Sequence, residues 1–210
     1  MKTEDLIARL ATDPVPHGAG PRTLFALAAM GALGVVAALF FGLIGPRADF
    51  LQALQTWRFD YKFLVTLALA ASASAVLVPL LYPESRANLR LLLIAPGLLA
   101  LAVVIELVTQ PASVWAMSAV GKNMVKCLTI VPALGIVPLL LMLLVIRSGA
   151  SPRPGWAGFA AGLVSGGLAA TFYAANCTDD SPLFVATWYP VAVLVLGGVG
   201  AAAGKVIGRW

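Results

Sequence analysis

The sequence contains six long runs of apolar residues, and these runs constrain its fold more than any other feature. An α-helix rises 1.5 Å per residue, so about 20 apolar residues are needed to cross the hydrocarbon core of a membrane. Short strands of alternating polarity, which would indicate a barrel, are absent. We therefore predict an all-α polytopic membrane protein, a bundle of six transmembrane helices. The runs cover residues 23–44, 63–81, 91–108, 127–146, 156–175 and 185–203.

The charged residues predict how the chain is oriented. Only 11% of the residues are charged and 60% are hydrophobic, which excludes an ordinary soluble domain. An even number of spans leaves both termini on one side, where nine of the fourteen lysines and arginines would lie. The positive-inside rule then places both termini in the cytoplasm. No basic run is dense enough to bind nucleic acid, so we expect the net charge of +5 to contact membrane lipids.

The first 22 residues form the longest segment predicted outside the membrane on the cytoplasmic side. A short amphipathic helix is expected there, with Leu6, Ile7 and Leu10 on one face. This face has two interpretations, because it can lie on lipid headgroups or bind a partner protein. The chain is thus divided into a cytoplasmic segment, 1–22, and a membrane domain, 23–210.

The polar stretch 176–184 separates two apolar runs and holds one of the two cysteines, Cys177. The other, Cys127, begins the fourth span, so both are expected on the outer face of the membrane. In bacteria that face is the oxidising periplasm, where a disulfide can persist. A disulfide requires Cα atoms about 4.4–6.8 Å apart, which neighbouring helix ends can supply. Two other interpretations of the cysteines are equally open at this point: a purely structural disulfide, and two inert buried thiols.

The neighbouring charges predict that the two thiols differ in reactivity. Cys127 lies at a helix N-terminus beside Lys126, and both features favour the thiolate. Cys177 lies at a helix C-terminus near Asp179 and Asp180, which oppose ionisation. We therefore expect Cys127 to react first and Cys177 to resolve the product.

The same two cysteines are also candidate metal ligands. Thiolates suit soft ions such as Cu(I), and Met124 lies one helical turn before Cys127 as a possible thioether ligand. We expect no resident cofactor, and at most a transient Cu or other soft metal ion at Cys127 and Cys177.

Glycines recur at every fourth position in the fifth and sixth spans, which predicts close packing of these helices. Because Gly166 and Cys177 are eleven residues apart, they should share one helical direction, which turns Cys177 toward the interior. Glu106 is the one acid inside a span, and we expect its carboxylate to reach water at the outer interface. The two glycine rows are 158, 162 and 166, and 200, 204 and 208.

No set of catalytic residues can be assembled from the sequence. There is no Cys-x-x-Cys motif, and the single histidine, His17, is predicted on the opposite side of the membrane from the cysteines. We therefore expect a protein that is not an enzyme. Two other classes remain as alternatives: a small multi-span transporter or channel that uses Glu106, and a membrane thiol oxidoreductase.

Two motifs and the six spans together resemble a known family. The motifs are the first ten residues, Met-Lys-Thr-Glu-Asp-Leu-Ile-Ala-Arg-Leu, and the stretch Asn-Cys-Thr-Asp-Asp-Ser-Pro-Leu-Phe at 176–184 followed by Trp188 and Tyr189. Over essentially the whole chain, the sequence resembles the NrsF family of proteobacterial inner-membrane anti-sigma factors.

This resemblance implies a negative regulator of an extracytoplasmic-function sigma factor. In such proteins the cytoplasmic N-terminal segment holds the sigma factor, which here assigns that contact to Leu6, Ile7 and Leu10. The resemblance further implies that Cys127 and Cys177 sense heavy-metal or oxidative stress. A segment of 22 residues is too short for a folded anti-sigma domain, so we expect a peptide-like helix to bind the partner.

Overall fold

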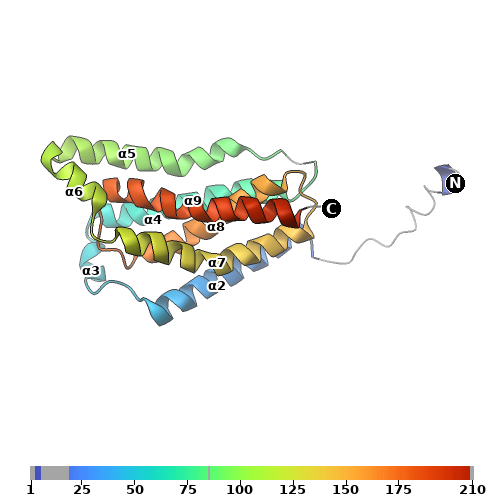
Figure 1. The fold of residues 1–210 in the computed structure, drawn as a ribbon, viewed down its shortest axis with the longest axis horizontal. Helices are drawn as coiled ribbons and strands as arrows, with labels where there is room; N and C mark the ends of the chain where they lie inside the picture. The colour runs from blue at the N-terminus through green and yellow to red at the C-terminus, as the bar shows by residue number, and fades with distance from the viewer. Residues whose placement is uncertain (1–2, 6–18, 85, 209–210) are drawn as a thin grey trace.

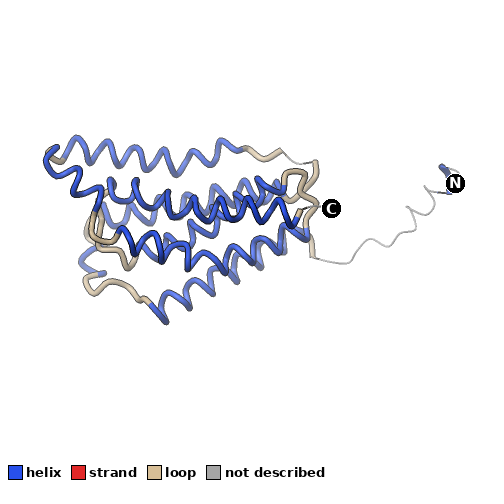
Figure 2. Tube along the Cα trace, viewed as in Figure 1, coloured by secondary structure: helices blue, strands red, loops and turns tan. Residues whose placement is uncertain are grey.

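The computed structural model describes residues 3–5, 19–84 and 86–208 (Figure 1). Every regular element in these ranges is a helix (Figure 2). Six of them are long and apolar enough to cross a membrane, which confirms the prediction of an all-α six-helix bundle. Leu6, Ile7 and Leu10 lie outside the described residues. The spans are α2 (Pro21–Leu43), α4 (Trp57–Leu80), η1 with α5 (Leu89–Leu93 and Ile94–Thr109), α7 (Met124–Ser148), α8 (Pro154–Ala174) and α9 (Pro182–Ile207).

The start of α2 and the end of α9 lie at the same end of the bundle (Figure 1). The opposite end, which we call the distal end, carries two connections that contain three short helices. These helices are α3 (Phe50–Ala53), η2 (Ala112–Val114) and α6 (Trp115–Val120). The loop between α8 and α9 also belongs to the distal end. An arrangement with both ends of the membrane domain on one side agrees with an even number of spans.

Helix α8 forms the centre of the bundle and packs against α9, α4, α7 and α2. Its contact with α9 depends on glycine: a Cβ atom added to Gly158 would lie 2.0 Å from the carbonyl oxygen of Gly200. A Cβ added to Gly162 would lie 2.3 Å from the carbonyl oxygen of Leu196. The close packing predicted from the glycine rows is therefore confirmed, because no larger residue fits at these positions. Helix α5 lies at the edge and contacts α4 and α9.

Candidate functional site

The loop at 175–181 connects the two most closely packed helices and carries Cys177. The helical hydrogen bonds of α8 continue past its last residue, because the amide of Cys177 donates to the carbonyl of Tyr173 at 3.0 Å. The side chain of Cys177 consequently points inward and is 1% exposed. The interior position expected from its spacing to Gly166 is confirmed.

The two cysteines are free, buried thiols in one cluster. Cys127, in the first turn of α7, has no exposed surface and lies close enough to Cys177 for the two thiols to interact electrostatically. Tyr173 and Tyr189 border the pair, and both hydroxyls lie near Cys177. The Tyr173 hydroxyl donates to the carbonyl of Asn123 at 3.4 Å, which connects α8 to the start of α7. The structure thus brings together the two residues that the sequence singled out.

Two cations hold the backbone and the carboxylate of this loop. The Nζ of Lys62 donates to the carbonyl oxygen of Cys177 at 2.9 Å and to Oδ1 of Asp180 at 2.6 Å. Arg47 donates to the same carbonyl at 3.3 Å and pairs with Oδ2 of Asp180 at 2.9 Å. Lys62 lies in the second turn of α4 and is 1% exposed, whereas the sequence placed it in an outer loop. Cys177 is therefore fixed to α4 and to the α2–α3 connection.

Asp179 connects the loop to the beginning of α7. Its Oδ2 accepts hydrogen bonds from the amides of Lys122 and Asn123 at 2.9 and 2.7 Å. The amides at a helix start have no partner within the helix, and a carboxylate there also interacts favourably with the helix dipole. Gly121 permits this approach, because its φ is +60° and a Cβ there would lie 2.3 Å from the ring of Phe184. No sequence pattern indicated the role of Gly121.

Ser181 connects the loop to α5 through a buried carboxylate. The Ser181 hydroxyl donates to Oε1 of Glu106 at 3.2 Å, and Arg58 pairs with Oε2 at 2.9 Å. Glu106 is 1% exposed, so the expectation that its carboxylate reaches water was wrong. The physical reason is its ion pair with Arg58, since a buried carboxylate is retained in its charged form only with such partners.

The remaining predicted site residues surround this cluster. Trp188 donates from Nε1 to the carbonyl of Ala119 at 2.9 Å and so connects α9 to α6. Lys126 is exposed and Met124 is half-buried. The cation that interacts electrostatically with the Cys177 thiol is Lys62. Burial raises the pKa of the Cys177 thiol, and the charge of Lys62 opposes that rise. Which thiol reacts first therefore stays a prediction.

In the described part of this cluster, the thiols rather than the carboxylates are the donor groups that a metal ion could use. Among the described residues, no group of three or more His, Cys, Asp and Glu side chains could hold a metal ion. Oδ2 of Asp179 accepts from α7, and both oxygens of Asp180 accept from Lys62 and Arg47. A two-coordinate soft ion between two sulfurs fits the chemistry of this cluster better than an ion that prefers oxygen.

Fold and site together define a small polytopic membrane protein with a buried thiol pair beneath its most connected loop. The chain belongs to the NrsF family, described as negative regulator of sigma F, whose sequence model matches residues 10–210. It is 34% identical over 215 aligned residues to the anti-sigma-F factor NrsF of Caulobacter vibrioides (strain NA1000 / CB15N), and the alignment covers the whole of both chains.

A second relative agrees with this assignment. The chain is 30% identical over 227 aligned residues to the probable anti-sigma-F factor NrsF of Azospira oryzae, again over the whole of both chains. No solved structure matches. The family resemblance inferred from the two sequence motifs is confirmed.

Proposed function

We propose that this protein is an anti-sigma factor of the bacterial inner membrane with both termini in the cytoplasm. It binds a sigma factor of the extracytoplasmic-function class there and releases it when stress acts on Cys127 and Cys177. Family membership supports the class of partner. The observation that carries the sensing role is that Cys177 lies in a loop hydrogen-bonded to four other segments and is buried together with Cys127.

The proposed chemistry at the pair is oxidation or capture of a soft metal ion. Hydrogen peroxide that forms the disulfide takes two electrons and two protons from the thiols and leaves as two molecules of water. A soft cation such as Cu(I) instead displaces the thiol protons and bridges the two sulfurs. Either event fixes a distance between α7 and the 175–181 loop that free thiols leave adjustable.

Transmission of the signal from the thiols to the other end of the bundle is assigned to α8 and α9. The two helices pack backbone to backbone at their glycines, from Gly166 in the middle of α8 to Gly204 against Pro154, so they cannot move apart without losing this packing. A shift of the loop that joins them therefore moves both helices together. Such coupling requires two arrangements of the bundle that the signal stabilises differently.

Binding of the sigma factor is assigned to the N-terminal segment 1–22. The sequence predicts that Leu6, Ile7 and Leu10 share the apolar face of a short helix, and such a helix is a common way for a peptide to occupy a groove on a partner. This contact is non-catalytic.

Glu106, the residue that a transport function would use, is engaged by Arg58 and Ser181, which supports a structural role for its carboxylate.

Separate Cys127→Ser and Cys177→Ser variants test the sensing role with a sigma-dependent reporter. We expect each to abolish induction by peroxide and by a soft metal while repression without stress persists. Ser165→Ala is a matched control, since Ser165 is buried in α8 and its hydroxyl bonds only within that helix, to Ala161. Full induction in both cysteine variants would refute sensing at this pair.

A further inference from the structure

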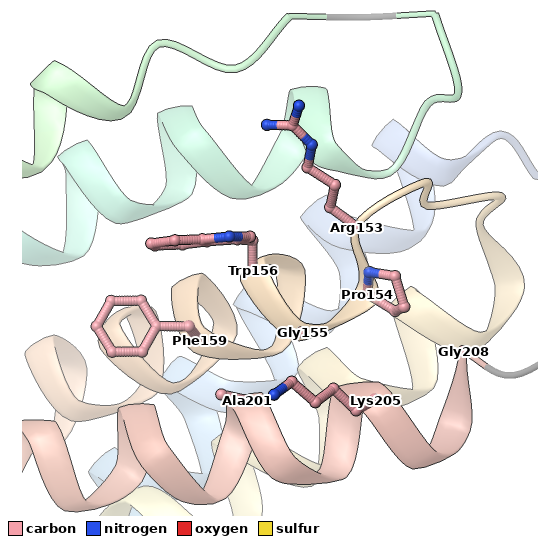
Figure 3. A pocket seen from close by; sticks show the side chains of 8 residues that line it. All are labelled: Arg153, Pro154, Gly155, Trp156, Phe159, Ala201, Lys205 and Gly208. Carbon is pink, nitrogen blue, oxygen red and sulfur yellow. The ribbon is translucent and has the colours of Figure 1, made fainter.

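Two neighbouring cavities on the bundle share one lining residue, Phe159. The first, of about 850 Å³, lies where α8 begins and α9 ends, at the end opposite to the thiols (Figure 3). The second, of about 310 Å³, lies between α4, η1 with α5, α8 and α9. Because Phe159 borders both, the two cavities adjoin each other, with the side chain of Phe159 between them.

The first cavity is basic and aromatic. Figure 3 shows Arg153 at the start of α8 and Lys205 on α9, with Trp156 and Phe159 along α8 beside them. Arg153 and Lys205 are exposed and form no ion pair with any residue that the structure describes. None of the eight residues in Figure 3 carries a carboxylate. Within the described part of the chain, the cavity therefore offers two cations without an anionic partner next to a tryptophan, the residue enriched where a membrane meets water.

The second cavity is apolar. Its lining consists of aliphatic and aromatic side chains, including Leu99 of α5, Leu163 of α8 and Leu194 of α9. The hydroxyl of Thr66, which also lines it, is satisfied by the carbonyl of Lys62. Leu194 is 52% exposed, so the cavity borders the surface that faces lipid. Its volume lies at the lower limit of small-molecule sites, roughly 300–1,000 Å³.

We propose that the two cavities form a binding site for one anionic phospholipid. The phosphate of the headgroup lies between Arg153 and Lys205, and one acyl chain passes Phe159 into the apolar cavity beneath α5. Charge complementarity selects the headgroup, since basic pockets between helices at the cytoplasmic side suit anionic lipid headgroups. An acidic peptide or a free phosphate would satisfy the cations alone and would leave the apolar cavity without an occupant. The apolar cavity reaches Tyr189, which also borders the thiols. The proposal rests on the cytoplasmic orientation proposed above but not on sensing at the cysteines.

The headgroup half is tested with the full chain in detergent by native mass spectrometry. The probes are phosphatidylglycerol and phosphatidylcholine with identical acyl chains, which differ in net charge. We expect the double variant R153Q/K205Q to bind phosphatidylglycerol about 30-fold more weakly, which corresponds to about 1 kcal/mol per cation. The control R86Q/R147Q removes two exposed charges outside the cavities and should bind as the unmodified protein does. Equal weakening in both double variants, or equal binding of the two lipids, would overturn the headgroup assignment.

The acyl-chain half is tested by filling the apolar cavity. Ala95 lines it and is 3% exposed, whereas Ala100 on the same helix is exposed. We expect Ala95→Phe to weaken the binding of phosphatidylglycerol at least about 10-fold, because the larger side chain would fill the cavity that holds the acyl chain. Ala100→Phe adds the same bulk outside the cavity and should leave the binding unchanged. Glycerol phosphate, the headgroup without chains, provides a test that needs no substitution and should not bind detectably. Binding of glycerol phosphate as tightly as the lipid, or displacement of the lipid by an equal concentration of a glutamate-rich peptide, would overturn the proposal.

Discussion

The ammonium group of Lys62 donates a hydrogen bond of 2.9 Å to the backbone carbonyl of Cys177, 115 positions further along the chain. The same group contacts Asp180 at 2.6 Å, so one buried cation fixes both the position of the cysteine and the loop that follows it. Any change at the Cys177 sulfur that moves its backbone must therefore alter the contact with α4.

Lys62→Met is expected to destabilise the protein by about 2 kcal/mol, because hydrogen bonds to charged groups contribute about 1.5–3 kcal/mol. Arg47 keeps its own contacts to Asp180 and limits the loss. The free energy of unfolding in detergent micelles, measured by titration with sodium dodecyl sulfate, checks this value. Lys126→Met removes an exposed lysine and should change the free energy by less than about 0.5 kcal/mol. Equal effects of the two substitutions would contradict the role of Lys62.

The reactivity of Cys177 should depend on the same lysine. Burial raises the pKa of the Cys177 thiol and Lys62 opposes the rise, so Lys62→Met should raise that pKa further. The thiolate is the reactive form, and the rate of modification by a small methanethiosulfonate reagent at pH 8 should consequently fall. The measurement uses a Cys127→Ser background, in which Cys177 is the sole cysteine. A rate profile against pH that Lys62→Met leaves unshifted would show that Lys62 does not act on the thiol.

Asp179→Asn should loosen the beginning of α7. The substitution removes the negative charge of the group that accepts from the amides of Lys122 and Asn123, and such a charge at a helix N-terminus contributes about 0.3–1 kcal/mol. Hydrogen exchange at these two amides should accelerate in proportion. Asp49→Asn is the control, since Asp49 is exposed and pairs only with Arg47. Unchanged exchange at Lys122 and Asn123 would mean that Asp179 is not their partner in the membrane.

Gly158→Ala should destabilise the contact between α8 and α9 by about 1–3 kcal/mol, the usual cost of overpacking. Its added Cβ would lie 2.0 Å from a backbone oxygen of Gly200, which has no flexible side chain to move aside. Gly198→Ala is the matched control in α9, because no atom lies within 4 Å of its added Cβ. We expect Gly198→Ala to be neutral or slightly stabilising, since alanine favours helix. The unfolding free energies of the two variants distinguish close packing from a general effect of glycine loss.

The sequence predicted the features that depend on local pattern. Apolar runs of sufficient length located all six spans, because the membrane imposes a length on any helix that crosses it. The glycine rows predicted that α8 and α9 each pack closely against neighbouring helices, and helical periodicity predicted that Cys177 faces inward. Each of these inferences needs only the geometry of one helix.

The polar contacts of the site could not be predicted in this way. Lys62 and Asp180 are 118 positions apart, and Glu106 and Ser181 are 75 apart, so their pairing depends on how the helices assemble. Glu106 was expected to reach water because its depth was known but its partner Arg58 was not. A charged residue close to an apolar run, such as Lys62, is the one sequence feature that could have indicated a buried partner.

The most direct test of the central claim is purification of the tagged full-length protein from membranes, followed by quantification of the bound sigma factor before and after peroxide. We expect the sigma factor to copurify before treatment and to be released afterwards. Release should be absent from the Cys177→Ser variant, and a Leu6→Asp/Leu10→Asp variant should bind none at any stage. A sigma factor released equally from the unmodified protein and from Cys177→Ser, or one that never copurifies, would contradict the account.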